Sequence, residues 1–291
     1  MQTLSAALSG SIQRLAEAVR TADYILLGAG AGLSAAAGLS YADEAIFRQR
    51  YPYWAARGLR SEYQMISFRS WTAAQQWAYY ASHISRVRWE MPPLPLYRQL
   101  KAILQDKNYY ILTSNVDRQF LRSGFPAQRV FEYQGTYDLL CCSQRCTTAV
   151  WPFWPVMQQM LVHTQSADFS IPDTLLPCCP HCGAPLRLAF RDYPQYGQEK
   201  AAYQQWLRQS EDGLLCIIEI GVGFNSPGVI RVPFERITGE RQQVRFFRIT
   251  ADYPDSEEEI AYPEIPRPIA GKSVSINADA ALVIQQLARL L

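Results

Sequence analysis

The apolar residues of this chain follow two spacings, and their alternation predicts its elements. Residues 11–22 have apolar positions at helical spacing. The apolar run 24–27 follows directly and predicts a short buried strand. It leads into a glycine-rich turn, and we expect the next helix to begin within 35–38. This order of strand, glycine turn and helix is the entry to a doubly wound α/β fold.

The alternation continues along the chain, so we expect a mostly parallel sheet covered by helices. The predicted fold class is α/β with a Rossmann-like sheet. Further helices are predicted at 96–104 and 279–291, and further strands at 109–113, 214–220 and 244–249.

Two segments interrupt the alternation and predict a smaller second domain. Residues 45–91 are rich in aromatic residues and arginine, and their pattern is helical. Residues 136–212 contain six of the seven cysteines and many prolines. We therefore expect a larger, discontinuous domain from 1–44, 92–135 and 213–291, and a smaller domain from 45–91 and 136–212 that consists of a helical insertion and a cysteine-rich segment.

Composition limits the classes of function. Apolar residues make up 48% of the 291 residues, so a large core is expected. The formal net charge is only +2, which argues against nucleic acid or a membrane surface as a partner. The first residues lack the pattern of a signal peptide, and no apolar run approaches the roughly 20 residues that span a bilayer. We therefore expect a cytoplasmic protein whose cysteines are metal ligands or thiols.

The glycine-rich turn is a candidate phosphate site. Gly30 and Gly32, with Ala31 between them, would let backbone N–H groups approach a pyrophosphate at a helix N-terminus, and Ser34 adds a hydroxyl. Leu33 occupies the third glycine position of the dehydrogenase pattern G-x-G-x-x-G, so the turn departs from that fingerprint. The alternative is a turn that only connects a strand to a helix.

Asn115 and Asp117 form a second candidate site, because they directly follow the predicted strand 109–113. Ligands of open α/β sheets bind outside the carboxyl ends of the strands. Side chains two positions apart on an extended segment point the same way. An amide and a carboxylate on one side could hold a carboxamide and polarise a neighbouring ribose. A turn stabilised by Asx hydrogen bonds is the simpler alternative.

Two closely spaced cysteine pairs predict a metal site. Four thiolates at such spacing fit a tetrahedral structural zinc ion, with no open position for water. Cys141 and Cys178 are adjacent alternatives, so the ligand register stays open by one residue. The candidate ligands are Cys142, Cys146, Cys179 and Cys182.

The predicted strand 214–220 ends in a further glycine segment. Gly221 and Gly223 permit close approach of a ligand, and Asn225 could bond a ribose hydroxyl. A plain loop is the alternative. Near the C-terminus, the segment 275–279 leads into the last predicted helix.

Together these motifs resemble the NAD-cleaving site of the sirtuin family. Residues 30–34 (G-A-G-L-S) with Gly38 are similar to the sirtuin pattern G-A-G-I-S-x-x-x-G, and residues 113–117 (T-S-N-V-D) to T-Q-N-I-D. The resemblance implies NAD as co-substrate and a structural zinc ribbon. It also implies a nicotinamide pocket around Ser114, Asn115 and Asp117, and an adenine contact through the backbone near Ile276.

One position departs from the family in a way that changes the expected chemistry. Gln134, before Gly135, occupies the place of the catalytic histidine, and the Pro-Asp-Phe-Arg cofactor loop is missing. These departures resemble the class M, macrodomain-linked microbial sirtuins. That resemblance implies mono-ADP-ribosyl transfer to a carrier protein, a lipoylated glycine cleavage H-like protein, which a partner macrodomain hydrolase reverses.

A glutamine amide can orient a ribose hydroxyl, but it cannot accept a proton as a general base. Breaking the N-glycosidic bond depends more on positioning and charge stabilisation. We therefore predict an NAD-dependent protein ADP-ribosyltransferase with Asn115, Asp117 and Gln134 as its catalytic residues. A weak NAD-dependent deacylase and an inactive sensor of NAD or ADP-ribose are the alternatives.

Overall fold

A computed structural model describes residues 4–224, 227–251 and 264–291. The chain forms two compact units. The first unit combines the chain up to Gly38 with Pro93–Gln134 and the chain from Gly197 onward, and the second combines Leu39–Pro92 with Gly135–Tyr196. In the described parts of the chain, no helix is both long and apolar enough to cross a membrane.

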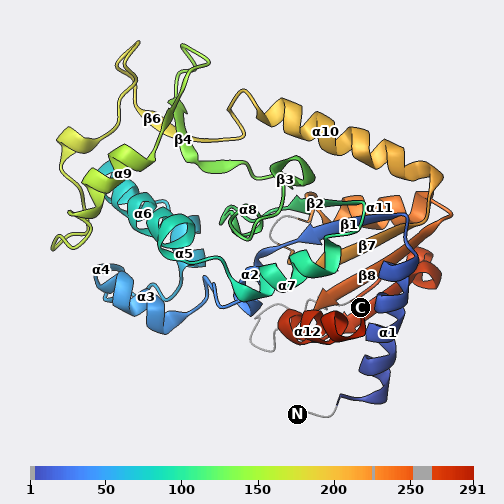
Figure 1. Cartoon of the computed structure of the whole chain (residues 1–291). Coiled ribbons are helices and arrows are strands. Elements are labelled where there is room, and N and C mark those ends of the chain that lie inside the picture. The colour runs from blue at the N-terminus through green and yellow to red at the C-terminus, as the bar shows by residue number, and fades with distance from the viewer. Residues whose placement is uncertain (1–3, 225–226, 252–263) are drawn as a thin grey trace. The chain divides into compact units, whose positions relative to one another are not determined.

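The first unit is built on a six-stranded parallel sheet with the order β3-β2-β1-β7-β8-β9 (Figure 1). The chain runs outward from β1 to β3 and then returns to the other side of β1, so the strand order reverses between β1 and β7. This reversal is the switch point at which doubly wound sheets bind ligands. The strands are β1 Tyr24–Ala29, β2 Tyr109–Thr113, β3 Val130–Glu132, β7 Leu215–Ile220, β8 Val244–Thr250 and β9 Ser273–Asn277.

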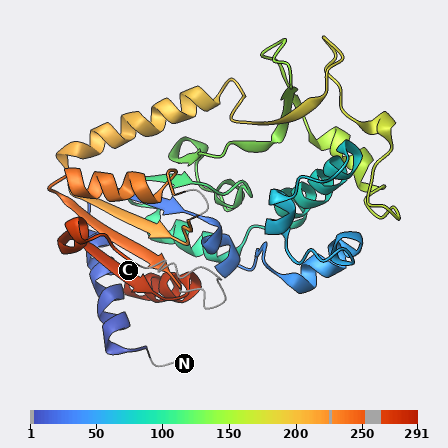
Figure 2. The same cartoon turned by 180° about the vertical axis from the view of Figure 1, so that it is seen from behind.

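Helices cover both faces of this sheet, with α1, α7 and α12 on one face and α10 and α11 on the other (Figures 1 and 2). The helix α12 begins where Asp279 accepts hydrogen bonds from the amides of Ala281 and Leu282, which satisfies two N–H groups of the first turn. The helices of this unit are α1 Ala6–Thr21, α2 Ala31–Ala36, α7 Pro95–Leu104, α8 Gln119–Arg122, α10 Tyr196–Gln209, α11 Arg231–Glu240 and α12 Ala280–Leu290, with short 3-10 turns at Ala127–Arg129, Ser210–Asp212 and Arg267–Lys272.

The predicted α/β class and parallel sheet are confirmed, and each of the predicted strands is present. One expected boundary is wrong. The helix after the glycine turn begins at Ala31, inside the turn, and ends at Ala36, where we expected it to start. Gly30 is its N-cap, and Gly38 follows with a φ of +98°, a backbone conformation that favours glycine.

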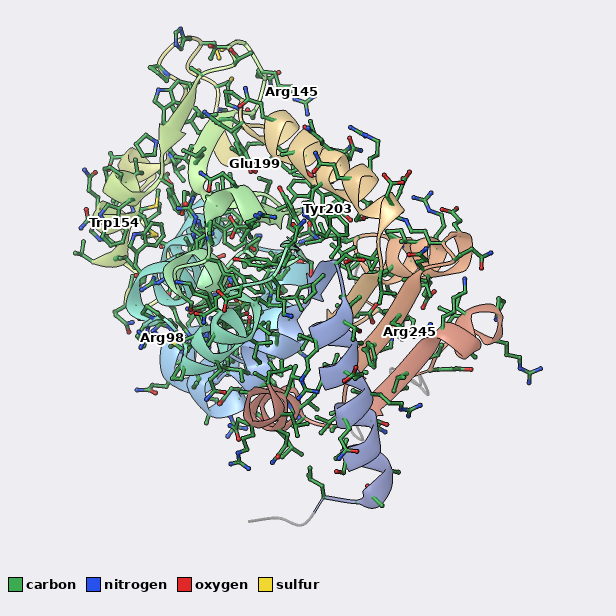
Figure 3. The ribbon with its side chains drawn as sticks, turned by 45° about the vertical axis from the view of Figure 1, so that its right-hand side comes forward. Arg98, Arg145, Trp154, Glu199, Tyr203 and Arg245 are labelled. Atoms are coloured by element: carbon green, nitrogen blue, oxygen red, sulfur yellow. The ribbon has the colours of Figure 1, made fainter. Side chains whose placement is uncertain are left out.

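The position of helix α10 differs from the predicted division into domains. That division assigned residues 196–212 to the smaller domain. Tyr203 and Trp206 of α10 pack on Tyr110 of β2. Nearly all of this helix, on which Figure 3 labels Glu199 and Tyr203, belongs to the first unit. Most of its other residues are polar, and so its sequence has no clear apolar stripe. The predicted limits of the two domains remain a prediction.

The second unit combines a group of helices with a three-stranded antiparallel sheet of order β5-β4-β6. A capping box begins the longest helix, because Thr72 and Gln75 bond each other's backbone amides. The elements are α3 Glu44–Arg50, α4 Pro52–Ala55, α5 Glu62–Ser67, α6 Ala73–Ser85, the π-helical turn Arg86–Glu90, β4 Thr136–Cys142, β5 Val150–Pro152, α9 Trp154–Leu161, the 3-10 turn Asp173–Leu175 and β6 Leu186–Phe190.

A buried carboxylate connects the helices of the second unit. Glu62 of α5 is 2% exposed. It accepts hydrogen bonds from Tyr51 and from Arg86, at 2.9 Å and 3.1 Å, and its Oε1 lies 3.1 Å from Nδ1 of His83. Burial alone would raise the pKa of Glu62, but His83 and Arg86 outweigh burial and hold this pKa below its ordinary value of 4.5.

Glu62→Gln is expected to lower the free energy of unfolding by about 3 kcal/mol at neutral pH, because Arg86 would stay buried without its counter-charge. Since the folded-state pKa is depressed, this stabilisation is present above 4.5 and is lost as the pH falls through the folded value. Urea unfolding at neutral pH, and again at a pH below the folded-state pKa of Glu62, measures the difference in free energy of unfolding. The matched control is Glu44→Gln, which removes an exposed ion pair with Arg48 and should cost well under about 1 kcal/mol. Equal losses in both variants would contradict the assignment.

Candidate functional site

The turns after β1 and β7 touch at the switch point of the sheet. A Cβ on Gly30 would lie 2.4 Å from the carbonyl oxygen of Gly221, and one on Gly32 would lie 2.7 Å from Gly221 Cα. Gly221 has a φ of +59°, and its own Cβ would lie 2.3 Å from the amide nitrogen of Leu33. Only glycine at these three positions lets the two turns approach this closely.

Two backbone amides of this turn are used within the protein. The amide of Gly30 donates to the carbonyl of Ile220 at 3.0 Å, and that of Gly32 donates to the carbonyl of Gly221 at 2.9 Å. The close approach that these glycines permit is therefore a contact between the backbones of the two turns. Contact of Gly30, Ala31 and Gly32 with a pyrophosphate remains a prediction.

Asn115 is held against the glycine turn by its amide nitrogen. Its side chain is 8% exposed, and Nδ2 donates to the carbonyl of Gly30 at 3.0 Å and to Ser34 Oγ at 3.1 Å. Its backbone amide donates to the Thr113 hydroxyl, which in turn donates to the carbonyl of Ala29. Among the residues that the structure describes, Oδ1 of Asn115 has no hydrogen-bond partner, and this oxygen is the group that can accept from a ligand.

Asp117 points to the same side as Asn115, as the spacing of two residues predicts. Its Oδ2 accepts a hydrogen bond from Ser34 at 2.6 Å, and its Oδ1 accepts one from the backbone amide of Gln119 at 3.0 Å. The second bond is the Asx turn that we considered as the alternative. Asp117 is only 2% exposed, so a large part of its role is to hold the polar group together.

Ser34 and Tyr97 complete this group. The Ser34 hydroxyl, which we expected to donate to a phosphate, donates instead to Asp117, and it lies 2.7 Å from the hydroxyl of Tyr97. The sequence analysis missed Tyr97. It lies in α7 among apolar residues at helical spacing, and this pattern indicates a core position.

Gln134 follows β3, the strand next to β2. The amide of Tyr133 donates to the carbonyl of Thr113 at 2.9 Å, which fixes the chain before Gln134 beside the end of β2. Gln134 is half-buried. In the second unit, Gly135 has a φ of +79°, and a Cβ there would lie 2.1 Å from the carbonyl oxygen of Phe190, so a side chain at this position would clash.

The remaining predicted ligand residues lie at the ends of other strands. The amide of Ser114 donates to the carbonyl of Ala29 at 3.1 Å, and its side chain is half-buried. Gly223 is half-buried in the segment after β7, and Ile276 is buried in β9, beside Ile249. Asn225 lies outside the described residues. Contacts of these residues with NAD remain predictions.

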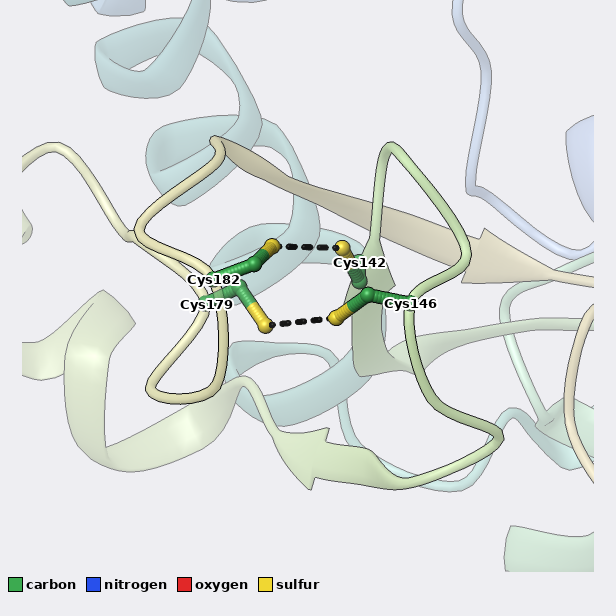
Figure 4. A group of neighbouring side chains, drawn as sticks. All are labelled: Cys142, Cys146, Cys179 and Cys182. Atoms are coloured by element: carbon green, nitrogen blue, oxygen red, sulfur yellow. Dashed lines mark hydrogen bonds between the residues drawn. The ribbon is translucent and has the colours of Figure 1, made fainter.

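Four cysteines of the second unit converge on one point (Figure 4). All four sulfur atoms lie within 4.8 Å of one another. The sulfurs of Cys142 and Cys182, and those of Cys146 and Cys179, are 3.6 Å apart. A tetrahedral zinc ion with Zn–S bonds of about 2.3 Å places its sulfurs about 3.8 Å apart, so this geometry fits zinc.

The adjacent cysteines lie outside the group. Cys141 is buried in β4, and burial raises the pKa of its thiol. Within the cluster the shifts are opposed: a hydrogen bond from the backbone of Cys146 lowers the pKa of Cys142, whereas the hydrogen bond with Cys182 raises the pKa of Cys146. The structure thus places Cys142 and Cys179 in the group, and their role as zinc ligands remains a prediction.

The fold is that of Sir2 homologues. One similar solved structure is a mutant Sir2 homologue in complex with ADP-ribose, with a TM-score of 0.57, 15% identity, and coverage of 96% of this chain and 95% of the other. Another is a Sir2 homologue in complex with NAD, with a TM-score of 0.56, 18% identity, and coverage of 95% and 92%. The predicted resemblance to the sirtuins is confirmed at the level of the fold.

Two curated proteins are similar in sequence. A probable bifunctional ADP-ribose hydrolase/ADP-ribosyltransferase from Fusarium oxysporum f. sp. cubense is 32% identical over 241 residues, which are 78% of this chain. A protein ADP-ribosyltransferase from Staphylococcus aureus is 27% identical over 278 residues, 93% of this chain. The chain spans 40% of the Fusarium relative and 84% of the Staphylococcus relative. No family model matches the chain.

Cys179→Ser is expected to lose the metal and to lower the melting temperature, because the free energy of metal binding is partly free energy of folding. Metal analysis of the purified protein should find one zinc ion per wild-type chain. The matched control is Cys178→Ser, which changes the neighbouring thiol outside the cluster and should keep its zinc. A wild-type protein without zinc, or equal zinc content in both variants, would refute the assignment.

Proposed function

We propose that the chain is an NAD-dependent protein mono-ADP-ribosyltransferase on a sirtuin scaffold. The fold supports this proposal, because similar structures are Sir2 homologues solved with NAD or ADP-ribose. The names of both relatives support the transferase activity. The observation that carries the proposal is the convergence of Asn115, Asp117 and Ser34 beside the glycine turn.

In the proposed reaction, the bond between nicotinamide and C1′ of the ribose breaks, and nicotinamide leaves. A side-chain nucleophile of the acceptor protein bonds to C1′ and releases its proton to water. Asn115 accepts a hydrogen bond from the ligand through Oδ1, and the carboxylate of Asp117 stabilises the positive charge that develops on the ribose. The turn of Gly30, Ala31 and Gly32 lies against the pyrophosphate.

On the adenosine side, Gly221, Gly223, Asn225 and Ile276 are proposed to line the site, as the resemblance to sirtuins implies. Ser114 is proposed to lie beside the nicotinamide ribose.

Gln134 decides between transfer and deacylation. It lies beyond the end of β3, next to β2, and its amide is proposed to orient a ribose hydroxyl. An amide accepts no proton, so the base-assisted step of deacylation is missing at this position. Proton transfer of this kind contributes typically 10²–10⁴-fold in rate, so only slow deacylation is expected.

The acceptor is proposed to be a carrier protein, and the resemblance to class M sirtuins implies a lipoylated one. A hydrolase that removes ADP-ribose, of the macrodomain type, is the proposed functional partner. The name of the Fusarium relative supports this pairing, because it joins an ADP-ribose hydrolase and an ADP-ribosyltransferase in one protein.

The function is tested with NAD labelled on the adenylate, incubated with the enzyme and a bacterial lysate. We expect nicotinamide release and a labelled protein that a macrodomain hydrolase clears. An acetyl-lysine peptide in a parallel reaction should stay largely intact. Rapid deacetylation without a labelled protein would favour the deacylase, and absence of nicotinamide release would favour the sensor.

Asn115→Ala is expected to abolish most nicotinamide release, because the site loses its acceptor oxygen. Asp117→Asn is expected to reduce release too, because the charge that stabilises the ribose is lost. Asparagine retains an acceptor oxygen for Ser34, whereas Asp117→Ala would leave buried donors unpaired and also destabilise the unit. Release rates and melting temperatures are measured together. Wild-type rates in folded Asn115→Ala would show that the site is misplaced.

Gln134→Ala is expected to reduce transfer by up to about tenfold, the equivalent of one lost hydrogen bond of about 0.5–1.5 kcal/mol. Because the amide does not titrate, the pH profile of wild-type transfer should have no limb that disappears in this variant. Initial rates of protein labelling across the pH range measure both effects. A limb that is lost in Gln134→Ala, or a rate that this variant leaves unchanged, would contradict the orienting role.

A further inference from the structure

The helical insertion of the second unit carries positive charge that its own acidic residues do not balance. Residues 45–91 contain seven arginines and no lysine, but only two acidic residues. Glu62 is buried and bonded to Arg86, and Glu90 forms an ion pair with Arg50 at 3.0 Å. Among the residues that the structure describes, no carboxylate lies within ion-pair distance of three exposed arginines of this insertion, Arg57, Arg60 and Arg69.

These three arginines share one folded segment with two exposed apolar side chains. The ring of Trp54 in α4 packs edge-on against Phe68, which follows α5, with the centroids 5.2 Å apart, so the chain folds back on itself between them. Tyr63 and Ile66 lie one turn apart in α5 and are 38% and 42% exposed. Both helices are labelled in Figure 1. We call the exposed part of this segment the arginine surface, which consists of Arg57, Arg60, Tyr63, Ile66 and Arg69.

Two arginines of the surface are held in place before any partner binds. The guanidinium of Arg57 lies 3.4 Å from the ring centroid of Tyr53 and donates to the Tyr53 carbonyl at 3.0 Å. Nη1 of Arg69 donates to the carbonyls of Ile66 and Phe68, both at 3.0 Å. A guanidinium has five N–H donors, and these bonds use one nitrogen of each arginine. The other donors are therefore available to a partner, and their fixed position lowers the entropy that binding costs.

The chemistry of the arginine surface fits an acidic face of a protein. A guanidinium presents paired donors that match a carboxylate, and the insertion uses arginine without lysine. Arginine and tyrosine are enriched at protein interfaces, where lysine and glutamate are depleted. The aliphatic Ile66 offers a nucleic acid neither a donor nor a stacking face, and the net charge of the whole chain is only +2. The surface is therefore complementary to a protein that combines clustered carboxylates with apolar side chains.

We propose that the arginine surface is the docking site for an acidic face of the protein that accepts ADP-ribose. The inference rests on the proposed function, because it takes the acceptor as the partner. A contact that is made equally before and during the reaction increases the affinity for the acceptor without changing the rate of the bound complex. Docking through this surface therefore lowers KM for the acceptor and leaves kcat unchanged.

The test compares two triple variants with the same change in net charge. The first reverses the charge of the arginine surface and consists of Arg57→Glu, Arg60→Glu and Arg69→Glu. The matched control reverses three exposed arginines of the first unit and consists of Arg14→Glu, Arg98→Glu and Arg245→Glu. Fluorescence anisotropy measures the binding of a fluorescein-labelled peptide of glutamate, leucine and glycine. Wild type and the control should bind this peptide alike, and the reversed variant should bind it about tenfold more weakly, the effect of three lost ion pairs.

Two further probes define what the surface recognises. A peptide with glutamine in place of glutamate should not bind, because it lacks the carboxylates. An oligouridylate of the same charge distinguishes a nucleic acid from an acidic protein, and its binding as tightly as the acidic peptide would overturn the inference. Full binding of the acidic peptide by the reversed variant would overturn it as well.

A second variant and gel filtration complete the binding test. If the melting temperature shows that the reversed variant does not fold, the milder set Arg57→Gln, Arg60→Gln and Arg69→Gln must weaken the binding of the acidic peptide. Failure of this set to do so is equally decisive. A dimer of wild type that the reversed variant does not form would assign the surface to a second copy of the chain and refute docking of an acceptor.

The kinetic test uses the protein that becomes labelled with ADP-ribose, purified and titrated as acceptor at saturating NAD. The reversed variant should raise KM for this acceptor about tenfold with kcat unchanged, and the control should keep both wild-type values. If the reversed variant labels the acceptor with wild-type KM, the docking inference fails and the transferase proposal stands. If wild type labels no protein, the transferase proposal fails, and the peptide titration alone decides whether the surface binds an acidic protein.

Discussion

The close contact of two turns at the switch point of the sheet is the constraint on which the candidate site depends. Gly30 and Gly32 lie against Gly221 at distances that a Cβ would not permit. The turn after β1 is bonded to the carbonyls of Ile220 and Gly221. This contact fixes the carbonyl of Gly30, and that carbonyl is the acceptor that holds the amide of Asn115. Backbone packing thus sets the orientation of a side chain far away in the sequence.

The sequence predicts the central strands well because β1, β2 and β7 are buried and mostly apolar, and β8 is rich in β-branched and aromatic residues. It predicts the edges less well. β3 has only three residues and β9 only five, so each segment is too short for its pattern to stand out. Tertiary packing determines that these short segments form strands, and a local sequence pattern does not contain this information.

The candidate site is predictable in its parts but not in its connections. The spacing of Asn115 and Asp117 predicts that they point the same way, and both do bond to Ser34. The sequence cannot show that Ser34 faces Asp117 rather than a phosphate, nor that Tyr97 reaches it from α7. The same limit applies to the glycines. Their positions predict that another group approaches the backbone closely, but the sequence does not show which group this is.

Burial and hydrogen-bond counting together explain why this group of polar residues is stable. Asp117 is a charged group at 2% exposure, and such a group is costly unless donors surround it. Ser34 and the amide of Gln119 supply those donors, and Tyr97 and Asn115 saturate Ser34 in turn. A group so fully bonded has few alternative arrangements. In the proposed reaction, the contribution of this group is therefore fixed orientation, on which cleavage of the glycosidic bond depends. Because the amide of Gln134 does not titrate, positioning is the main contribution that the proposed site can make.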